Sequence, residues 1–214
     1  MIAVTFALPN ESSGFVRRMR ESNYATEVRV VHTGVGESAA RKSLVNFLAQ
    51  ESPRILISAG FAGATSEKLK VADILIGENF SETALLERAR ALGVVGKLKT
   101  IPQVADNASE RGAIAQTSGA LAIDMETEFI ASACAERNIP LLSLRAISDT
   151  PRAPFSIPLP VLFDMERQRT NFAALFGYVA RHPSSVKHLI RIARQTNAAR
   201  RSLAEALDSI LRVL

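Results

Sequence analysis

The sequence predicts an α/β fold: a single domain whose central sheet is mixed but mostly parallel and is flanked by helices. Apolar, β-branched runs alternate with helix-like segments, and this alternation is typical of a parallel sheet covered by helices. The length of 214 residues fits one such domain, and 47% hydrophobic with 22% charged residues is an ordinary composition for it. We therefore predict one domain over 1–214, with a basic helical C-terminal segment at 161–214.

Each strand is expected where apolar and β-branched residues run together, and each helix where the spacing changes to that of a helix. The first run opens the chain and lacks the basic start of a secretory signal, so we interpret it as a buried strand. The expected strands are 2–7, 27–32, 54–58, 73–77, 97–101, 120–123 and 141–147. The expected helices are 12–21, 38–50, 82–92, 109–117 and 127–137, with two more near the C-terminus. The segment 151–160 contains four prolines and is predicted to be a rigid irregular loop.

The net charge of +5 is unevenly distributed, because residues 151–214 hold ten Arg or Lys and four Asp or Glu. Residues 184–214 have helical spacing, with apolar side chains on one broad face and basic ones elsewhere. One interpretation is a helix packed on the sheet with a solvated basic face. The alternative is peripheral contact with an anionic membrane surface or with nucleic acid. No aromatic interleaving supports nucleic acid, and no nucleic-acid partner is predicted.

Cysteine and histidine usage limits the chemistry. Cys134 is the only cysteine, so an internal disulfide is impossible, and we expect a small core residue in a cytoplasmic protein. His32, His182 and His188 lack the spacing of metal ligands, and no metal is predicted. No apolar run reaches the length that spans a membrane.

Two carboxylates stand where buried strands are expected to end. Glu126 follows the apolar run 120–123, and Asp149 follows the run 141–147. Ligands of α/β sheets bind at the carboxyl ends of strands, and an unpaired charge buried there is costly. These two side chains are therefore candidates for a functional site. We interpret Asp124 and Glu128 as ordinary acids at the start of a helix, and Glu11 has the same default interpretation.

Two glycine-rich turns follow expected strands. The turn Thr33-Gly34-Val35-Gly36 matches a dinucleotide fingerprint in form, but the next strand does not end in the acid that would hold a ribose. A dinucleotide site is therefore rejected. Two interpretations remain open: amides that bind a phosphate or ribose oxygen, or a tight turn that needs glycine for packing. The second turn, at 58–64, includes Gly60 and would allow a close approach of backbone and ligand.

Taken together, these motifs resemble the nucleoside phosphorylase and nucleosidase family. The resemblance runs in order through five elements at 7–11, 33–36, 59–63, 123–128 and 145–149. The last two are Ile-Asp-Met-Glu-Thr-Glu and Arg-Ala-Ile-Ser-Asp, and they are the most specific. The segments 180–183 and 198–201 look most like the subgroup linked to hopanoid lipid synthesis.

The resemblance implies roles for individual residues. Met125 would pack against the ribose, and Glu126 would bind its 2′ and 3′ hydroxyls. Asp149 would face N7 of the purine and be steadied by Ser148, while Glu11 would orient or activate an attacking water. The remaining expected substrate-binding residues are Gly34, Gly60, Phe61, Val104, Ala105 and Asp106.

The resemblance implies cleavage of the N-ribosidic bond of a purine nucleoside, expected to be a 5′-modified adenosine. It also implies a homodimer or higher homo-oligomer, and no cofactor other than phosphate as a co-substrate. Hydrolysis and phosphorolysis both stay open, although Ser58 stands where some phosphorylases carry a phosphate-binding arginine. One rival is a nucleoside sensor of the same fold that lost turnover through Phe61. Another is a basic interaction module acting through residues 184–214.

Overall fold

The computed structural model describes residues 1–22, 24–105, 107–155, 157, 159–164, 166 and 168–214. A central sheet of eight strands has the order β2-β1-β3-β8-β4-β5, with β7 pairing to β3 and β6 pairing to β7. The strands are β1 Ile2–Phe6, β2 Val28–His32, β3 Ile55–Ala64, β4 Ile74–Gly77, β5 Val94–Gly96, β6 Leu98–Thr100, β7 Ala122–Asp124 and β8 Leu141–Asp149. The pairs β3–β7 and β4–β8 are antiparallel and the other five are parallel. The predicted mixed, mostly parallel sheet is confirmed.

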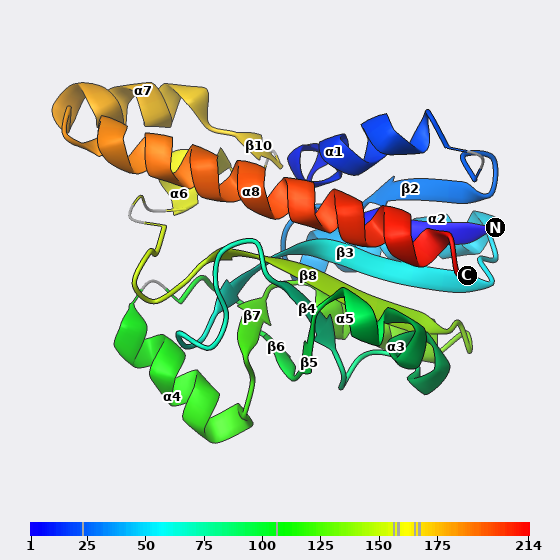
Figure 1. The fold of residues 1–214 in the computed structure, drawn as a ribbon. Coiled ribbons are helices and arrows are strands. Elements are labelled where there is room, and N and C mark those ends of the chain that lie inside the picture. The colour runs from blue at the N-terminus through cyan, green and yellow to red at the C-terminus, as the bar shows by residue number, and fades with distance from the viewer. Residues whose placement is uncertain (23, 106, 156, 158, 165, 167) are drawn as a thin grey trace.

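Helices cover both faces of this sheet (Figure 1). The helical elements are α1 Pro9–Met19, α2 Glu37–Gln50, α3 Thr83–Ala89, the short η1 Arg90–Leu92, α4 Ala108–Ser118, α5 Thr127–Ala135, α6 Leu159–Leu162, α7 Phe172–Arg181 and α8 Ser185–Leu211. One core lies between the sheet and α1, α3 and α8, and it contains Phe15, Leu85 and Leu207. A second core lies against α2 and α5, and Cys134 is buried there as predicted.

Two strands at the centre of the sheet extend further than their sequence patterns indicate. β3 continues to Ala64 through the glycine-rich turn, and β8 continues to Asp149. Small residues weaken strand propensity, but both strands are buried between neighbours that pair with them. The strand β5 was not predicted. It begins directly after Gly93, where a side chain would meet the carbonyl oxygen of Ile74 at 2.2 Å.

The segment 161–214 combines two helices with a short antiparallel hairpin, formed by β9 Phe163–Asp164 and β10 Arg169–Thr170. The C-terminal half of α8 buries Leu203, Leu207 and Ile210 against the sheet, as the packed-helix interpretation expects. α7 and the N-terminal half of α8 extend past the edge of the domain (Figure 1). In the described ranges, no helix is both long and apolar enough to cross a membrane.

Candidate functional site

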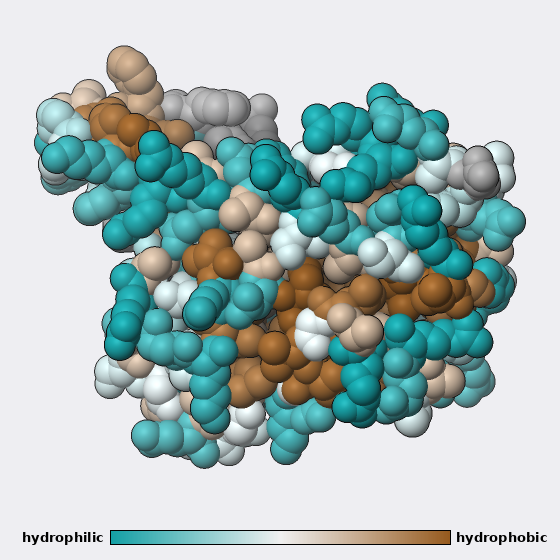
Figure 2. Space-filling view, in the orientation of Figure 1, coloured by the Kyte–Doolittle hydropathy of each residue, from teal (hydrophilic) through white to brown (hydrophobic). Residues whose placement is uncertain are grey.

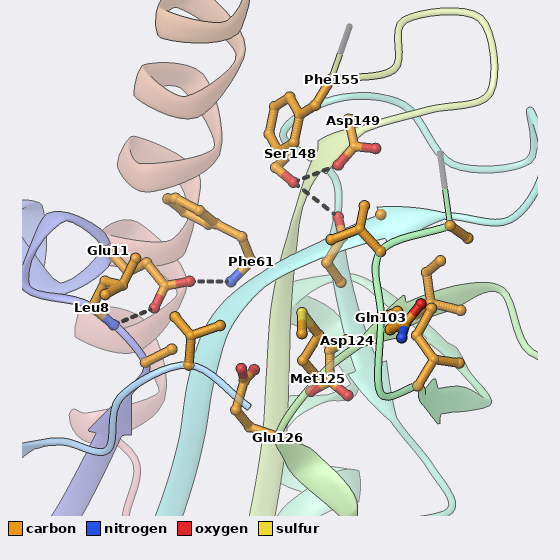
Figure 3. A pocket seen from close by; sticks show the side chains of 18 of the residues that line it. Leu8, Glu11, Phe61, Gln103, Asp124, Met125, Glu126, Ser148, Asp149 and Phe155 are labelled. Carbon is orange, nitrogen blue, oxygen red and sulfur yellow. Dashed lines mark hydrogen bonds between the residues drawn. The ribbon is translucent and has the colours of Figure 1, made fainter. Parts of the chain in front are cut away.

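A cavity of about 210 Å³ opens at the carboxyl ends of β1, β3, β7 and β8. Residues from several elements line it, and Figure 3 shows the carboxylates of Glu11, Glu126 and Asp149 around this space. Of the residues expected from the sequence, those that line the cavity are Glu11, Phe61, Val104, Ala105, Met125, Glu126, Ser148 and Asp149. The structure therefore brings together side chains that are up to 138 positions apart in the chain, from Glu11 to Asp149.

Two expected residues lie elsewhere. Gly34 borders a neighbouring hollow, with a left-handed φ of +83° that favours glycine. Gly60 lies beneath Glu11 in a small adjoining hollow, where an added Cβ would be 3.3 Å from Glu11 Oε1. Asp106 lies outside the described residues. For Gly34 and Gly60, the packing explanation therefore accounts for the glycine.

The turn that contains Gly34 is held by the hairpin β9–β10. Gln168 accepts a hydrogen bond from the N–H of Val35 at 2.7 Å and donates one to its carbonyl oxygen at 3.2 Å. Gln168 itself has a left-handed φ of +49°. The next amide of the turn, at Gly36, donates to Glu126 Oε1 at 2.8 Å. Residues from the hairpin, the turn and α5 are thus connected next to the cavity.

Glu11 lies in the first turn of α1, immediately after β1. Its Oε2 accepts from the N–H of Leu8 at 3.0 Å, which is the helix-start interaction expected by default. Its Oε1 accepts from the N–H of Phe61 in β3 at 3.0 Å, so the carboxylate also bridges to the cavity wall. Burial raises the pKa of Glu11, although these amides and the charge of Arg145 oppose the shift.

Glu126 precedes α5 and is almost fully buried. Burial is the main cause that raises its pKa to about 8, and the charges of Asp124 and Glu11 raise it further. The N–H of Gly36 opposes this shift by donating to the carboxylate. At neutral pH the unliganded side chain is therefore mostly protonated, and a neighbouring positive charge would ionise it.

Asp149 and Ser148 line the part of the cavity that lies away from Glu11 and Glu126, as Figure 3 shows. Ser148 Oγ donates to Asp149 Oδ1 at 2.8 Å, and Arg111 Nη2 donates to Asp149 Oδ2 in a buried ion pair. Arg111 also donates to the carbonyl oxygens of Ala105 at 2.9 Å and Ala64 at 3.1 Å. An opposite charge in contact favours the ionised carboxylate.

Arg111 is a residue of the candidate site that the sequence did not indicate. It lies in the N-terminal half of α4, at a distance of 38 residues from Asp149 in the sequence. Its only sequence signal is a cation near the start of a helix, where the helix dipole disfavours positive charge. A buried partner explains that placement.

Asp124 corrects one interpretation made from the sequence. It does accept from the N–H of Thr127 at 3.1 Å, as a helix-start acid would. It is also buried in the cavity wall, where Arg145 donates to it from Nε at 3.0 Å and from Nη2 at 2.9 Å. Arg145 further donates to the carbonyl oxygen and hydroxyl of Ser58 at 2.7 and 2.8 Å. Asp124 is therefore a helix-start acid as expected, but not an ordinary one, because it also neutralises a buried guanidinium.

Known proteins resemble this chain in sequence. Residues 100–181 match the family model described as the phosphorylase superfamily. A 5′-methylthioadenosine/S-adenosylhomocysteine nucleosidase of Staphylococcus aureus is 25% identical over 156 residues, which cover 58% of this chain and 68% of that protein.

Solved structures share the whole fold at low sequence identity. A futalosine hydrolase of Helicobacter pylori is 14% identical, with a TM-score of 0.72 and coverage of 100% of this chain and 97% of that one. A 5′-methylthioadenosine/S-adenosylhomocysteine nucleosidase of S. pneumoniae is 19% identical, also with a TM-score of 0.72, and the match covers 99% and 98% of the two chains. The relation to the hopanoid-linked subgroup stays a prediction. The matched family model, the nucleosidase relative and the shared fold each make this chain similar to nucleoside phosphorylases and nucleosidases.

Proposed function

We propose that this chain hydrolyses the N-ribosidic bond of a purine nucleoside and releases the free base. The observation that carries the proposal is the convergence of Glu11, Glu126 and Asp149 on one cavity from three separate elements. Cleavage of this bond builds positive charge on the sugar and negative charge on the departing purine. In this site two carboxylates are separated from a third carboxylate that has different hydrogen-bond partners. Such a site can act on both the sugar and the departing purine.

Asp149 is the group that serves the leaving base. Protonated Asp149 would give its proton to N7, so that the purine leaves without a net negative charge. The carboxylate that remains would be stabilised by Arg111 and Ser148, which already donate to its two oxygens. These donors stabilise the charge that develops in the transition state, which is how an interaction accelerates the chemical step. The same two donors hold the Asp149 carboxyl group in place before a substrate binds.

Glu126 and Glu11 serve the sugar. Glu126 would accept hydrogen bonds from the ribose hydroxyls, beside Met125, and its charge would stabilise the developing sugar cation. That cation would in turn ionise a carboxyl group whose pKa is about 8 in the unliganded protein. Glu11, held by the amides of Leu8 and Phe61, would orient the attacking water and accept the proton that this water releases.

Water is the nucleophile that the local charges favour. A phosphate dianion beside Glu11 and Glu126 would meet two carboxyl groups, and both would oppose its charge when ionised. The cation that acts on both of them is Arg145, whose donors are directed to Asp124, Thr127 and Ser58. A bidentate contact from Arg145 to phosphate would require those buried bonds to break.

The substrate we propose is a 5′-modified adenosine. Beside its carboxylates the cavity has apolar walls, which include Leu8, Val35 and Phe155. Such walls suit an apolar 5′ substituent better than a bare hydroxyl, because they bury apolar surface. The relatives named for methylthioadenosine cleavage act on a nucleoside of this kind.

Product analysis tests the proposal directly. The purified protein is incubated with adenosine, 5′-methylthioadenosine and inosine, each with and without phosphate, and the base and sugar products are separated by chromatography. We expect adenine and an unphosphorylated sugar, equal with and without phosphate, and fastest release from the 5′-modified substrate. A sugar 1-phosphate that forms only with phosphate would replace hydrolysis by phosphorolysis. Nucleoside binding without any release of base would favour the sensor.

A further inference from the structure

The arm formed by α7 and the N-terminal half of α8 carries a surface that the proposed reaction does not use. We define this arm surface by six exposed side chains, which are Phe176, Arg181, Val186, Lys187, Ile190 and Arg194. Residues 168–204 contain seven Arg or Lys and no Asp or Glu. An ordinary solvated helix face mixes both signs of charge, so a stretch of this length with one sign calls for a specific explanation.

The basic side chains of the arm surface are exposed. Arg181, Lys187 and Arg194 are exposed, and within the described ranges they form no ion pair. Lys187 and Arg194 are seven positions apart on α8, so they lie on the same side of the helix. Their charges therefore face solvent together.

Apolar side chains are exposed beside these charges. Phe176 is 79% exposed, and Val186 and Ile190 are 42% and 48% exposed. These three are half of the six large hydrophobic side chains that the described chain leaves exposed. Figure 2 shows apolar side chains over α7 next to hydrophilic ones along α8. Exposed apolar side chains at this density mark an interaction surface rather than a solvated one.

The positive surface continues along α8 into a groove against α1. This groove has a volume of about 230 Å³ and is lined by Arg17, Arg18, Arg200 and Arg201. Glu205 pairs with Arg18 at 3.0 Å and neutralises one of the four. The cationic field therefore extends from the arm surface across the same side of the molecule.

We propose that the arm surface docks on an anionic lipid bilayer. Basic side chains would be attracted to the lipid headgroups, while Phe176, Val186 and Ile190 would enter the interfacial region. A second copy of this chain is disfavoured, because two arm surfaces of the same sign would repel each other. Nucleic acid would engage the arginines but would leave the exposed apolar side chains without a partner.

Vesicle sedimentation of the full chain tests the proposal. The vesicles are pure phosphatidylcholine, or phosphatidylcholine with 30% phosphatidylglycerol, at low and at 0.5 M salt. We expect binding to the anionic vesicles alone, weakened at high salt. Each Lys or Arg near an anionic surface contributes about fivefold in affinity, so the double variant Lys187→Glu and Arg194→Glu should lose at least tenfold. Phe176→Ser with Ile190→Ser should lose binding severalfold at both salt concentrations.

The matched control is Lys97→Glu with Lys99→Glu, which makes the same charge change at exposed positions around β6. It should bind vesicles within about twofold of the unaltered chain. Circular dichroism and turnover of a water-soluble nucleoside should be unchanged in all variants, which separates this proposal from the proposed reaction. Equal binding to neutral vesicles, equal loss in the control, or preference for a DNA or RNA competitor over the anionic vesicles would overturn it.

Discussion

Glu126→Gln should remove a large part of the pH dependence of stability. The pKa of Glu126 is raised from 4.5 to about 8, mainly by burial. Between these values the folded chain binds a proton that the unfolded chain has released, so the free energy of unfolding falls as pH rises. At about 1.4 kcal/mol per pKa unit, the decrease is about 5 kcal/mol across this window. Below pH 4.5 and above pH 8 this residue adds no further slope.

Glutamine resembles the protonated side chain, since it keeps an oxygen that can accept from Gly36 N–H. The variant should match the unaltered chain near pH 5 and exceed its stability near pH 9 by about 5 kcal/mol. That difference corresponds to roughly 10–20 °C in Tm for a chain of this size.

Urea unfolding at pH values from 5 to 9 measures this difference. The control is Glu128→Gln on the same helix, because the Glu128 side chain is 56% exposed and should change the curve little. Glu11 also has a raised pKa, so some slope should persist in the Glu126 variant. Parallel curves for Glu126→Gln and the unaltered chain would refute the reasoning, since burial would then not hold a proton on this carboxyl group.

Three further predictions concern turnover. Asp149→Asn should lower kcat by two to four powers of ten with KM within a few-fold, as measured by release of base, because the proton donor is lost; an unchanged kcat would remove Asp149 from the mechanism. Arg111→Gln should lower kcat by about two powers of ten, because the carboxylate left on Asp149 loses the buried cation that stabilises it; an unchanged kcat would contradict this role. Gly60→Ala should lower kcat about tenfold and stability by about 1 kcal/mol, since the added Cβ would be 3.3 Å from Glu11 Oε1, whereas Gly112→Ala, in open space, should do neither.

The layout of the sheet and the two carboxylates at strand ends could be predicted from the sequence, because both depend on local patterns. Glu126 and Asp149 directly follow apolar runs, and the carboxyl ends of such runs meet at one edge of a sheet. The ion pairs of the site could not be predicted in this way. Arg111 reaches Asp149 from a separate helix, and Arg145 reaches Asp124 across the sheet, so both depend on tertiary packing.

The predicted bounds of some strands were wrong for a similar reason. β3 continues through Gly60 and Gly63 because strands on both sides pair with it, although glycine favours a turn in isolation. β5 is three residues long, and its start depends on the contact between Gly93 and Ile74. Sequence periodicity cannot detect either effect, since both arise from neighbours that are distant in the chain.

Two hydrogen bonds, one in each direction between Gln168 and Val35, fasten the hairpin β9–β10 to the turn beside Glu126. Val35 is adjacent to Gly36, whose N–H holds Glu126. A displacement of the hairpin would break both of these bonds and loosen the Gly36 amide, which opposes proton uptake by Glu126. The position of the hairpin and the proton affinity of the Glu126 carboxyl group are thereby coupled.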